Sequence, residues 1–392
     1  MNRCLSVLAL VVAVPACARD RGAAPRPVQA ATADPQAAAP ATARELRVSE
    51  VARGLEHPWA VALLPDGSFL VTERPGRLRR VSAAGRLSPP LAGLPGVWAH
   101  GQGGLLDVVL APDYASSHRI FFSYAEPGPD GSAGTAAASA VLGADAVSDV
   151  RVIYRQEPKL VGPNHFGSRI AFDGHGHVFI SQGERFSYRM YAQDLSKLQG
   201  KLVRLDPDGG IPADNPFVHA PNARPETWSF GHRNVQGLAI DPRTGVLWES
   251  EHGPLGGDEL NRPQPGRNYG WPIASYGMDY GTGRPYPETR GTQVPGTEQP
   301  VRVWKKSPGL SGMAFYTGHP RSAWNDSLFL GALADQDLIR LSLDGERITG
   351  EERLLDDVGA RIRDVRVGAD GNVYVLTDEA DGRLLRLTPP AR

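Results

Sequence analysis

Short runs of alternating apolar and polar residues recur from about residue 45 to the C-terminus. In four places such a run follows a turn that contains Asp and Gly: LPDGSFLVTE (64–73), FDGHGHVFISQGE (172–184), IDPRTGVLWESE (240–251) and GADGNVYVLTDE (368–379). Alternation with a period of two is typical of a half-buried β-strand, and Asp-Gly favours a tight hairpin turn. We therefore predict four strands, each introduced by a turn.

Each of these runs is followed within a few residues by a second strand-like run, as in GRLRRVS (76–82), GKLVRLD (200–206) and GRLLRLT (382–388). A further pair, SLFLGAL and DLIRLSLDG, lies within residues 327–345 and lacks the leading turn. Repeated hairpins with loose spacing indicate an all-β fold made of similar units. When such units are arranged around a central axis, the fold is a β-propeller. Blades of about 50–60 residues divide a body of roughly 345 residues into about six.

The predicted fold is thus all-β, a six-bladed β-propeller over residues 45–392. A β-sandwich with an additional domain is the alternative, but no change in composition marks a domain boundary. One short segment, YAQDLSKLQ (191–199), has a helical pattern. Because function in a propeller lies on the loops at one face around the axis, the polar strand ends and long loops are expected to converge there.

The N-terminus has the pattern of an export signal. After Arg3, the apolar run LSVLALVVAV is too short for a lasting membrane helix and ends in VPAC. This ending resembles the lipobox of bacterial lipoproteins, in which Cys17 would be acylated; cleavage without lipid is the alternative. Residues 18–44, rich in Ala and Pro, cannot bury enough surface to fold. We expect a signal peptide over 1–17, a disordered tether over 18–44, and an exported, periplasm-facing protein that contacts the membrane only through this anchor.

Composition narrows the chemistry of the body. The formal net charge is -1 and no basic cluster occurs, which argues against nucleic acid as a partner. Both cysteines lie in the first 17 residues, so disulfides, thiolate zinc sites and cysteine nucleophiles are excluded from the body. A GxSxG serine-hydrolase motif is also absent. Metal chemistry must therefore use oxygen or imidazole ligands; His175 and His177 could bind a metal, but a chance pairing is the better interpretation.

The segment ESEHGPLGGDELN (249–261) is richer than a hairpin turn requires. It contains three glycines, a proline and four carboxylates directly after an apolar strand. Glycine and proline allow backbone carbonyls to turn toward a common point, and carbonyl and carboxylate oxygens are the ligands of calcium. A solvated acidic loop explains the same residues equally well. The segment alone leaves the two interpretations open.

Several loops together resemble the soluble quinoprotein sugar dehydrogenases, the glucose/sorbosone dehydrogenase family, which binds pyrroloquinoline quinone (PQQ) on a six-bladed propeller. The similarity is greatest to the aldose sugar dehydrogenase branch. It runs in the family's order from about residue 50 to 390 over the segments HPWAVALLPDG (57–67), HGQGGLLDVVLAPDY (100–114), NHFGSRIAF (164–172), LQGKLVRLDPDG (198–209), FGHRNVQGLAIDP (230–242), EHGPLGGDELN with NYGWP (251–272), and RIRDV with DGNVYVLTD (361–378).

The resemblance implies catalytic roles for three residues. His165 matches the general base, and a histidine that titrates near neutrality suits removal of a hydroxyl proton. Glu184 matches the carboxylate that orients this imidazole. Arg233 matches a contact to the quinone, where a guanidinium would stabilise the charge that develops as hydride arrives. A single histidine is usually a structural residue, and here the surrounding motif favours catalysis.

The resemblance also implies the binding residues. Arg233 with Asn234, and Gln102, match cofactor contacts, while Asn164 stands where the family's dimeric glucose dehydrogenases have an aspartate and would contact substrate or cofactor. The cationic clamp on the carboxylates of PQQ is matched by Arg361 and Arg363, which would share one strand face because they alternate by two. The expected metal residues are Gly253 and Pro254, through their carbonyls, for a catalytic calcium, and Glu259 and the Tyr269 carbonyl for a second, structural calcium. Asp258 and Glu251 brace this turn, serve the neighbouring ion or are only solvated.

One departure weakens the predicted clamp. The dimeric glucose dehydrogenases carry a lysine in the loop that corresponds to ALADQDL (332–338), where this chain offers Ala334 or Asp335. Looser binding of PQQ would follow. Of the tryptophans, Trp59 is expected in the core, and Trp271 either lines the face or packs.

The implied activity is oxidation of aldose sugars at C1 to lactones, with PQQ and calcium as cofactors and an electron acceptor that the sequence does not identify. A non-catalytic propeller that binds sugars or a protein is one alternative. A calcium-dependent lactonase on a similar propeller is the other, and it would act on lactones without a quinone.

Overall fold

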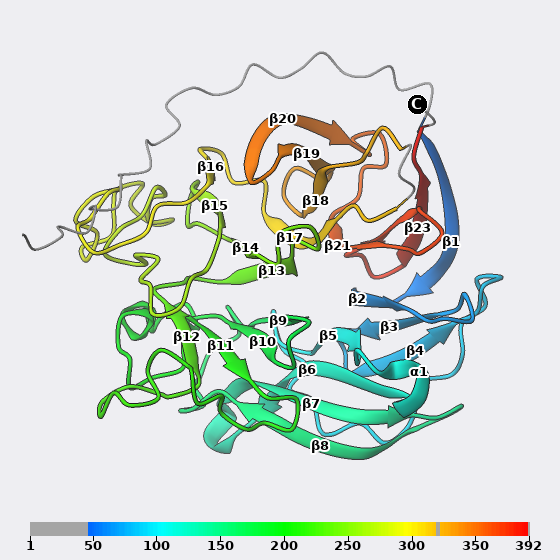
Figure 1. Cartoon of the computed structure of the whole chain (residues 1–392), viewed down its shortest axis with the longest axis horizontal. Coiled ribbons are helices and arrows are strands. Elements are labelled where there is room, and N and C mark those ends of the chain that lie inside the picture. The colour runs from blue at the N-terminus through cyan, green and yellow to red at the C-terminus, as the bar shows by residue number, and fades with distance from the viewer. Residues whose placement is uncertain (1–45, 319–321, 391–392) are drawn as a thin grey trace, which may run out of the picture. The chain divides into compact units, whose positions relative to one another are not determined.

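The structure is a computed structural model that describes residues 46–318 and 322–390. The expected signal peptide, the tether and Cys17 lie outside these residues. The described part is built from six antiparallel sheets arranged around a central axis (Figure 1). The predicted six-bladed β-propeller is confirmed, and the β-sandwich alternative is wrong.

Each sheet forms one blade, whose strands follow one another from the axis outward. In that order the strands are β2 (Pro58–Leu63), β3 (Phe69–Glu73) and β4 (Arg77–Val81) in blade 1; β5 (Leu105–Leu110), β6 (Arg119–Pro127), β7 (Ala133–Leu142) and β8 (Val147–Arg155) in blade 2; β9 (Gly167–Phe172), β10 (Val178–Gln182), β11 (Lys201–Leu205) and β12 (Thr227–Phe230) in blade 3; β13 (Val235–Ile240), β14 (Leu247–Glu251), β15 (Asp258–Asn261) and β16 (Arg302–Trp304) in blade 4; β17 (Leu310–Phe315), β18 (Ser327–Ala332), β19 (Leu338–Asp344) and β20 (Arg347–Leu354) in blade 5; and β21 (Ile362–Val367), β22 (Val373–Thr377), β23 (Gly382–Thr388) and β1 (Arg47–Leu55) in blade 6.

The ring is closed by its first strand. Strand β1 pairs antiparallel with β23, with Arg47 opposite Thr388, so the two ends of the propeller share one blade. The inner strands contact one another in the cyclic order β2, β5, β9, β13, β17, β21 and back to β2. An apolar cluster fills each of the six spaces between adjacent blades. Middle strands such as β3 and β14 are therefore buried on both faces.

Helices contribute little. The described residues contain the short helix α1 (Tyr114–Ser117) and two 3₁₀ turns, η1 (Pro129–Gly131) and η2 (Arg189–Ala192). The helix expected over 191–199 is wrong, because the ammonium of Lys201 donates hydrogen bonds to the carbonyls of Tyr191, Ala192 and Gln199 at 2.7, 3.1 and 2.8 Å. The backbone bonds in this segment are those of separate turns, from the Asp194 N–H to Tyr191 and from the Lys197 N–H to Asp194, each at 3.1 Å. No helix of the described part is long and apolar enough to cross a membrane.

A buried ion cluster lies where the inner strands meet. The guanidinium of Arg169 contacts Asp107 at 3.3 Å and Asp364 at 2.8 Å, and Arg366 contacts the same carboxylates at 2.8 and 3.2 Å. Backbone N–H groups of Val61 and Ile170 donate to these carboxylates as well. Two acids and two bases on three blades thus satisfy one another at the axis.

Candidate active site

The start of each inner strand and the end of the next strand meet at one face of the propeller, because the two strands are antiparallel. Each of the six inner strands has a register irregularity near its start. Such bulges redirect side chains at the rim of a sheet. The motif residues lie at these positions: His165 precedes β9, Arg233 precedes β13, Glu184 follows β10 and Gly253 follows β14.

His165 and Glu184 form a buried pair. The imidazole Nδ1 lies 2.6 Å from Glu184 Oε2, and the two side chains are 6% and 1% exposed. His165 sits in the left-handed region at φ 56°, and its N–H donates to Gln102 Oε1 at 2.8 Å. Burial lowers the pKa of His165 below 6.5, and the carboxylate of Glu184 opposes the shift. With Nδ1 engaged, Nε2 is the nitrogen that can accept a proton.

Arg233 connects this pair to the glycine-rich turn. Its carbonyl accepts the N–H of Glu184 at 3.0 Å. Its guanidinium Nη1 donates to the carbonyls of His252 and Gly253 at 3.1 and 2.8 Å, and it lies 5.2 Å from the ring of Trp271. Two backbone carbonyls therefore converge on one positive charge, beside the His165 pair. Trp271 lines this part of the face and also packs edge-on against Tyr286.

The glycines of the turn are required by close backbone packing. A Cβ at Gly253 would lie 2.3 Å from the carbonyl oxygens of Gly256 and Gly257. Asp258 is 1% exposed and accepts N–H bonds from Gly253, Gly309 and Leu310 at 3.0, 2.9 and 3.0 Å. The interpretation of Asp258 as solvated is therefore wrong, and this carboxylate braces the turn.

A buried acidic group lies next to the turn. Ligand atoms of His232, Glu249 and Glu251 are within 4.8 Å of one another. Glu251 is 3% exposed, so it too is not solvated. Burial, followed by the charge of Glu251, raises the pKa of Glu249 to about 7. Within the described residues, both carboxylate oxygens of Glu249 and Oδ1 of Asn261 are buried without a hydrogen-bond partner. Burial and Glu251 likewise raise the pKa of Glu259 well above its usual value.

The predicted metal residues line one small pocket together. Gly253, Pro254, Glu259 and Tyr269 all contribute to it, with Arg233 and His252 among the other lining residues. The Tyr269 ring stacks on His232 with centroids 4.9 Å apart. The structure thus brings all four predicted metal residues within one pocket of the face.

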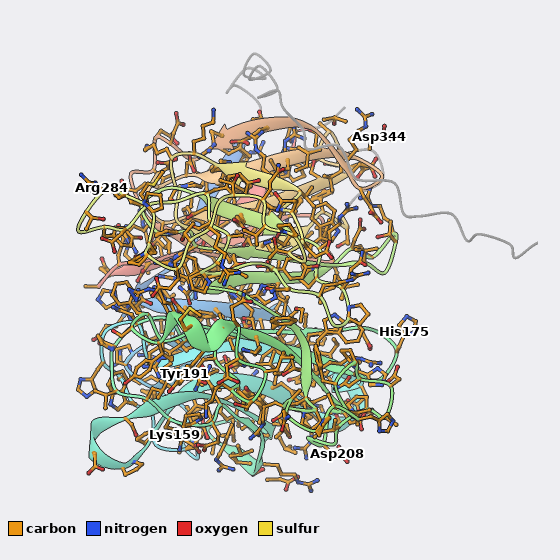
Figure 2. All side chains as sticks on the ribbon, turned by 90° about the vertical axis from the view of Figure 1, so that its left-hand side faces the viewer. Lys159, His175, Tyr191, Asp208, Arg284 and Asp344 are labelled. Atoms are coloured by element: carbon orange, nitrogen blue, oxygen red, sulfur yellow. The ribbon has the colours of Figure 1, made fainter. Side chains whose placement is uncertain are left out.

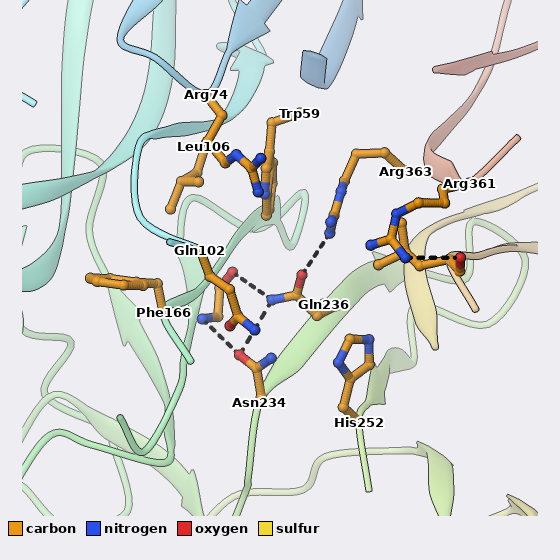
Figure 3. Close-up of a pocket in the computed structure, with 12 residues that line it drawn as sticks. Trp59, Arg74, Gln102, Leu106, Phe166, Asn234, Gln236, His252, Arg361 and Arg363 are labelled. Carbon is orange, nitrogen blue, oxygen red and sulfur yellow. Dashed lines mark hydrogen bonds between the residues drawn. The ribbon is translucent and has the colours of Figure 1, made fainter. Parts of the chain in front are cut away.

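A second cavity adjoins this pocket and shares His252 with it (Figure 3). Its remaining lining residues come from all six blades and their loops: Trp59, Arg74, Gln102, Leu106, Phe166, Gly167, Asn234, Gln236, Leu333, Arg361 and Arg363. Gln102, Asn234, Arg361 and Arg363 were predicted to bind a cofactor. Polar amides lie on one side of this cavity and guanidinium groups on the other.

The arginine side of the cavity is only partly neutralised. Arg363 donates to Gln236 Oε1 at 3.0 Å and to Asp378 Oδ2 at 2.9 Å. Arg361 reaches the same Asp378 oxygen at 3.4 Å and the Leu333 carbonyl at 3.1 Å. Asp378 is thus shared by two arginines.

Other predicted residues lie elsewhere. Asn164 does not line the cavity, and its carbonyl accepts a bond from Arg185 Nε at 3.0 Å. His175 projects from the surface (Figure 2), whereas His177 contacts Asp173 at 2.8 Å. The two histidines therefore do not form a shared metal site.

Eight of the cavity's lining residues were not predicted from the sequence, and four of them have side chains that bear on ligand binding. Trp59 is buried as expected but lines the cavity, and Arg74, Gln236 and His252 join it there. The His252 ring donates from Nε2 to the Leu310 carbonyl at 2.5 Å, which leaves Nδ1 as an acceptor without a partner in the described residues. Trp59, Gln236 and His252 lie within the matched segments, which was the one available signal; Arg74 lies outside them.

Comparisons with known proteins show the family of the chain. Aldose sugar dehydrogenase YliI of Escherichia coli is 54% identical over 355 residues, covering 90% of this chain and 94% of that protein. The crystal structure of soluble aldose sugar dehydrogenase from Escherichia coli in the apo-form has a TM-score of 0.85 at 53% identity and covers 88% of this chain and 99% of that one. The PQQ-bound aldose sugar dehydrogenase from Streptomyces coelicolor has a TM-score of 0.73 at 30% identity, with 88% and 98% covered. The family model of glucose / sorbosone dehydrogenase matches residues 55–386, and the chain belongs to this family.

Proposed function

We propose that this protein is a PQQ- and calcium-dependent aldose sugar dehydrogenase that oxidises the sugar at C1 to the lactone. The observation that carries the proposal is the buried His165–Glu184 pair, 2.6 Å apart; His165 bonds through its N–H to Gln102, which lines the arginine-containing cavity. Family membership and the similarity to named aldose sugar dehydrogenases support the same conclusion.

The cavity suits a planar polycarboxylate such as PQQ. Arg361 and Arg363 would bind carboxylates, and the amides of Gln102 and Asn234 lie across the cavity, where they could contact the ring system. When bound, PQQ supplies the quinone that accepts the hydride. The aromatic ring of Trp59 and the side chain of Leu106 provide apolar wall on the same cavity.

The turn and the acidic group suit calcium. The carbonyls of His252 and Gly253 already accept hydrogen bonds from one positive charge, the Arg233 guanidinium. The Glu249 oxygens have no hydrogen-bond partner in the described residues, although Oε1 lies 3.6 Å from His232 Nδ1; with Glu259 and the Tyr269 carbonyl they have the oxygen chemistry of a second site. Gly253 and Pro254 would hold the catalytic ion, which acts as a Lewis acid.

Three residues of the chain would then have separate roles in the reaction. His165 Nε2 takes the C1 hydroxyl proton while the C1 hydride leaves to the quinone, so that C1 becomes the lactone carbonyl. Glu184 fixes the tautomer through Nδ1 and stabilises the imidazolium that forms. Arg233 stabilises negative charge that develops on the quinone oxygen. Electrons leave to a separate acceptor.

Export belongs to the proposal as well. The signal over residues 1–17, the tether over 18–44 and acylation at Cys17 are read from the sequence, and they would place the propeller on the periplasmic side.

The test adds PQQ and calcium to purified apoprotein and follows reduction of an artificial dye with a panel of aldoses. We expect reduction that requires both additions and that His165→Gln abolishes, since Gln cannot serve as the base. Turnover of lactones without quinone would favour the lactonase. Sugar binding without any dye reduction, unaffected by His165→Gln, would favour the binding protein.

A further inference from the structure

Arg74 is a third arginine in the cavity, and its backbone is held rigidly. It follows β3, and its N–H donates to the His57 carbonyl at 3.1 Å while its own carbonyl accepts from Leu105 at 3.2 Å. A Cβ at Gly104 would lie 2.1 Å from that carbonyl oxygen, so only glycine allows this approach. The side chain therefore extends into the cavity from a fixed point, beside Trp59 (Figure 3).

The guanidinium of Arg74 has no partner within residues 46–318 and 322–390. Arg361 and Arg363 each bind Asp378, whereas no hydrogen bond or ion pair joins the guanidinium of Arg74 to another group of the described structure. Burial lowers the pKa of Arg74, and the charges of Arg363 and Arg361 add to this, with Asp378 opposing. The cavity wall thus carries three guanidinium groups and one carboxylate, which two of them share, an excess of about two positive charges.

The neighbouring loop supplies no further cation. At 332–338 the acidic side chain of Asp335 pairs with Lys306 at 2.7 Å and Arg353 at 3.3 Å, and neither residue lines the cavity. A half-buried guanidinium without a counter-charge is unfavourable unless a ligand provides one.

We propose that Arg74 is a ligand-binding residue which, with Arg361 and Arg363, forms a three-guanidinium site for a rigid planar ligand that carries several carboxylates. Insofar as this ligand is PQQ, the inference rests on the proposed function. Arg74 would compensate for the basic residue missing at Ala334, so PQQ affinity need not be loose.

The test uses Arg74→Gln, with two probes titrated into the apoprotein by fluorescence or absorbance: PQQ, and benzene-1,2,4-tricarboxylate, which has the charge but no quinone. Removal of one charge-assisted contact should weaken PQQ binding by about 10- to 100-fold. The salt dependence of binding should also fall, and Arg74→Lys should restore part of the affinity. Because Arg74 has no protein partner within the described residues, the Tm of the variant should equal or exceed that of wild type.

Arg79→Gln is the matched control. Arg79 lies in the same blade, outside the cavity, and binds the Ser88 carbonyl at 2.6 Å and Glu73 at 3.6 Å. This variant should lose stability and keep its affinity, the opposite of Arg74→Gln. Unchanged affinity of Arg74→Gln for the ligand that wild type binds, or a lowered Tm in that variant, would refute the inference. If wild type binds the tricarboxylate through Arg74 but not PQQ, the inference stands and the proposed function fails; binding of neither probe overturns both.

Discussion

Asp258 offers the sharpest test of how the candidate metal turn is held. Its two carboxylate oxygens accept three backbone N–H bonds, Oδ1 from Gly253 and Oδ2 from Gly309 and Leu310, at 2.9 to 3.0 Å. Asp258→Asn keeps the shape but has one acceptor oxygen. In its better orientation it retains the two bonds of Oδ2 and turns an NH₂ group toward the Gly253 N–H.

The cost can be worked from these contacts. One charge-assisted bond is lost, at about 1.5–3 kcal/mol, and the two that remain become neutral and weaker, so the free energy of unfolding should fall by about 3 kcal/mol. With a urea m-value of about 3 kcal/mol/M, the unfolding midpoint should drop by about 1 M. The assay is equilibrium urea unfolding followed by tryptophan fluorescence.

Asp344→Asn is the control for this experiment. Asp344 and its partner Arg347 are both 71% exposed, and such surface pairs contribute about 0–1 kcal/mol. Its midpoint should stay close to that of wild type. If Asp258→Asn unfolds at the same urea concentration as Asp344→Asn, the carboxylate does not brace the turn and our account of the glycine-rich segment is wrong.

Three further predictions concern titration and tautomers. Because burial lowers the pKa of His165, the acid limb of the pH profile of kcat/KM should lie below pH 6.5. Glu184→Gln should move this limb to lower pH and reduce kcat/KM by about 10- to 100-fold. A limb that moves to higher pH in this variant would contradict the assignment. Burial lowers the pKa of Lys201 from 10.5 to about 7, so the unfolded state binds more protons than the folded state between these two pH values. The free energy of unfolding should therefore rise with pH in this range, by up to about 1.4 kcal/mol per pH unit. Urea unfolding of Lys201→Met should not show this rise. His252→Asn can retain an acceptor at the Nδ1 position, whereas His252→Gln can retain the donor to the Leu310 carbonyl. Titration with PQQ should therefore show weaker binding in His252→Gln than in His252→Asn. The reverse order would assign the ring a structural role.

The sequence predicted the strands of a blade best where a turn containing Asp and Gly precedes a strand. The four Asp-Gly turns introduce β3, β10, β14 and β22, each the second strand of its blade. Blade 2 was not recognised, because β7 is an almost uniform run of small residues, AGTAAASAVL, buried along most of its length. Strands in the interior of a propeller are covered on both faces, which removes the period-two pattern.

The site was predictable only through its motifs. His165, Arg233 and Gly253 lie in conspicuous segments, and the structure brings them together. Arg74 and Trp59 sit in ordinary strand contexts, where a cavity-facing side chain cannot be told from a packed or solvated one until neighbouring blades are placed. For the same reason Asp258 could be taken as solvent-exposed, although its partners Gly309 and Leu310 lie some fifty positions away.

The pairing of β1 with β23 also sets the order of events during maturation. The contact between Arg47 and Thr388 spans nearly the whole body, so it carries a large loop-closure cost and cannot form until the last blade has been made. Until then β1 lacks the strand it pairs with and its edge is unpaired, which invites association with other chains. A nascent chain in this state is a natural client for holdase chaperones, and removal of about ten residues at either end of the propeller, the length of one such strand, should leave it permanently open.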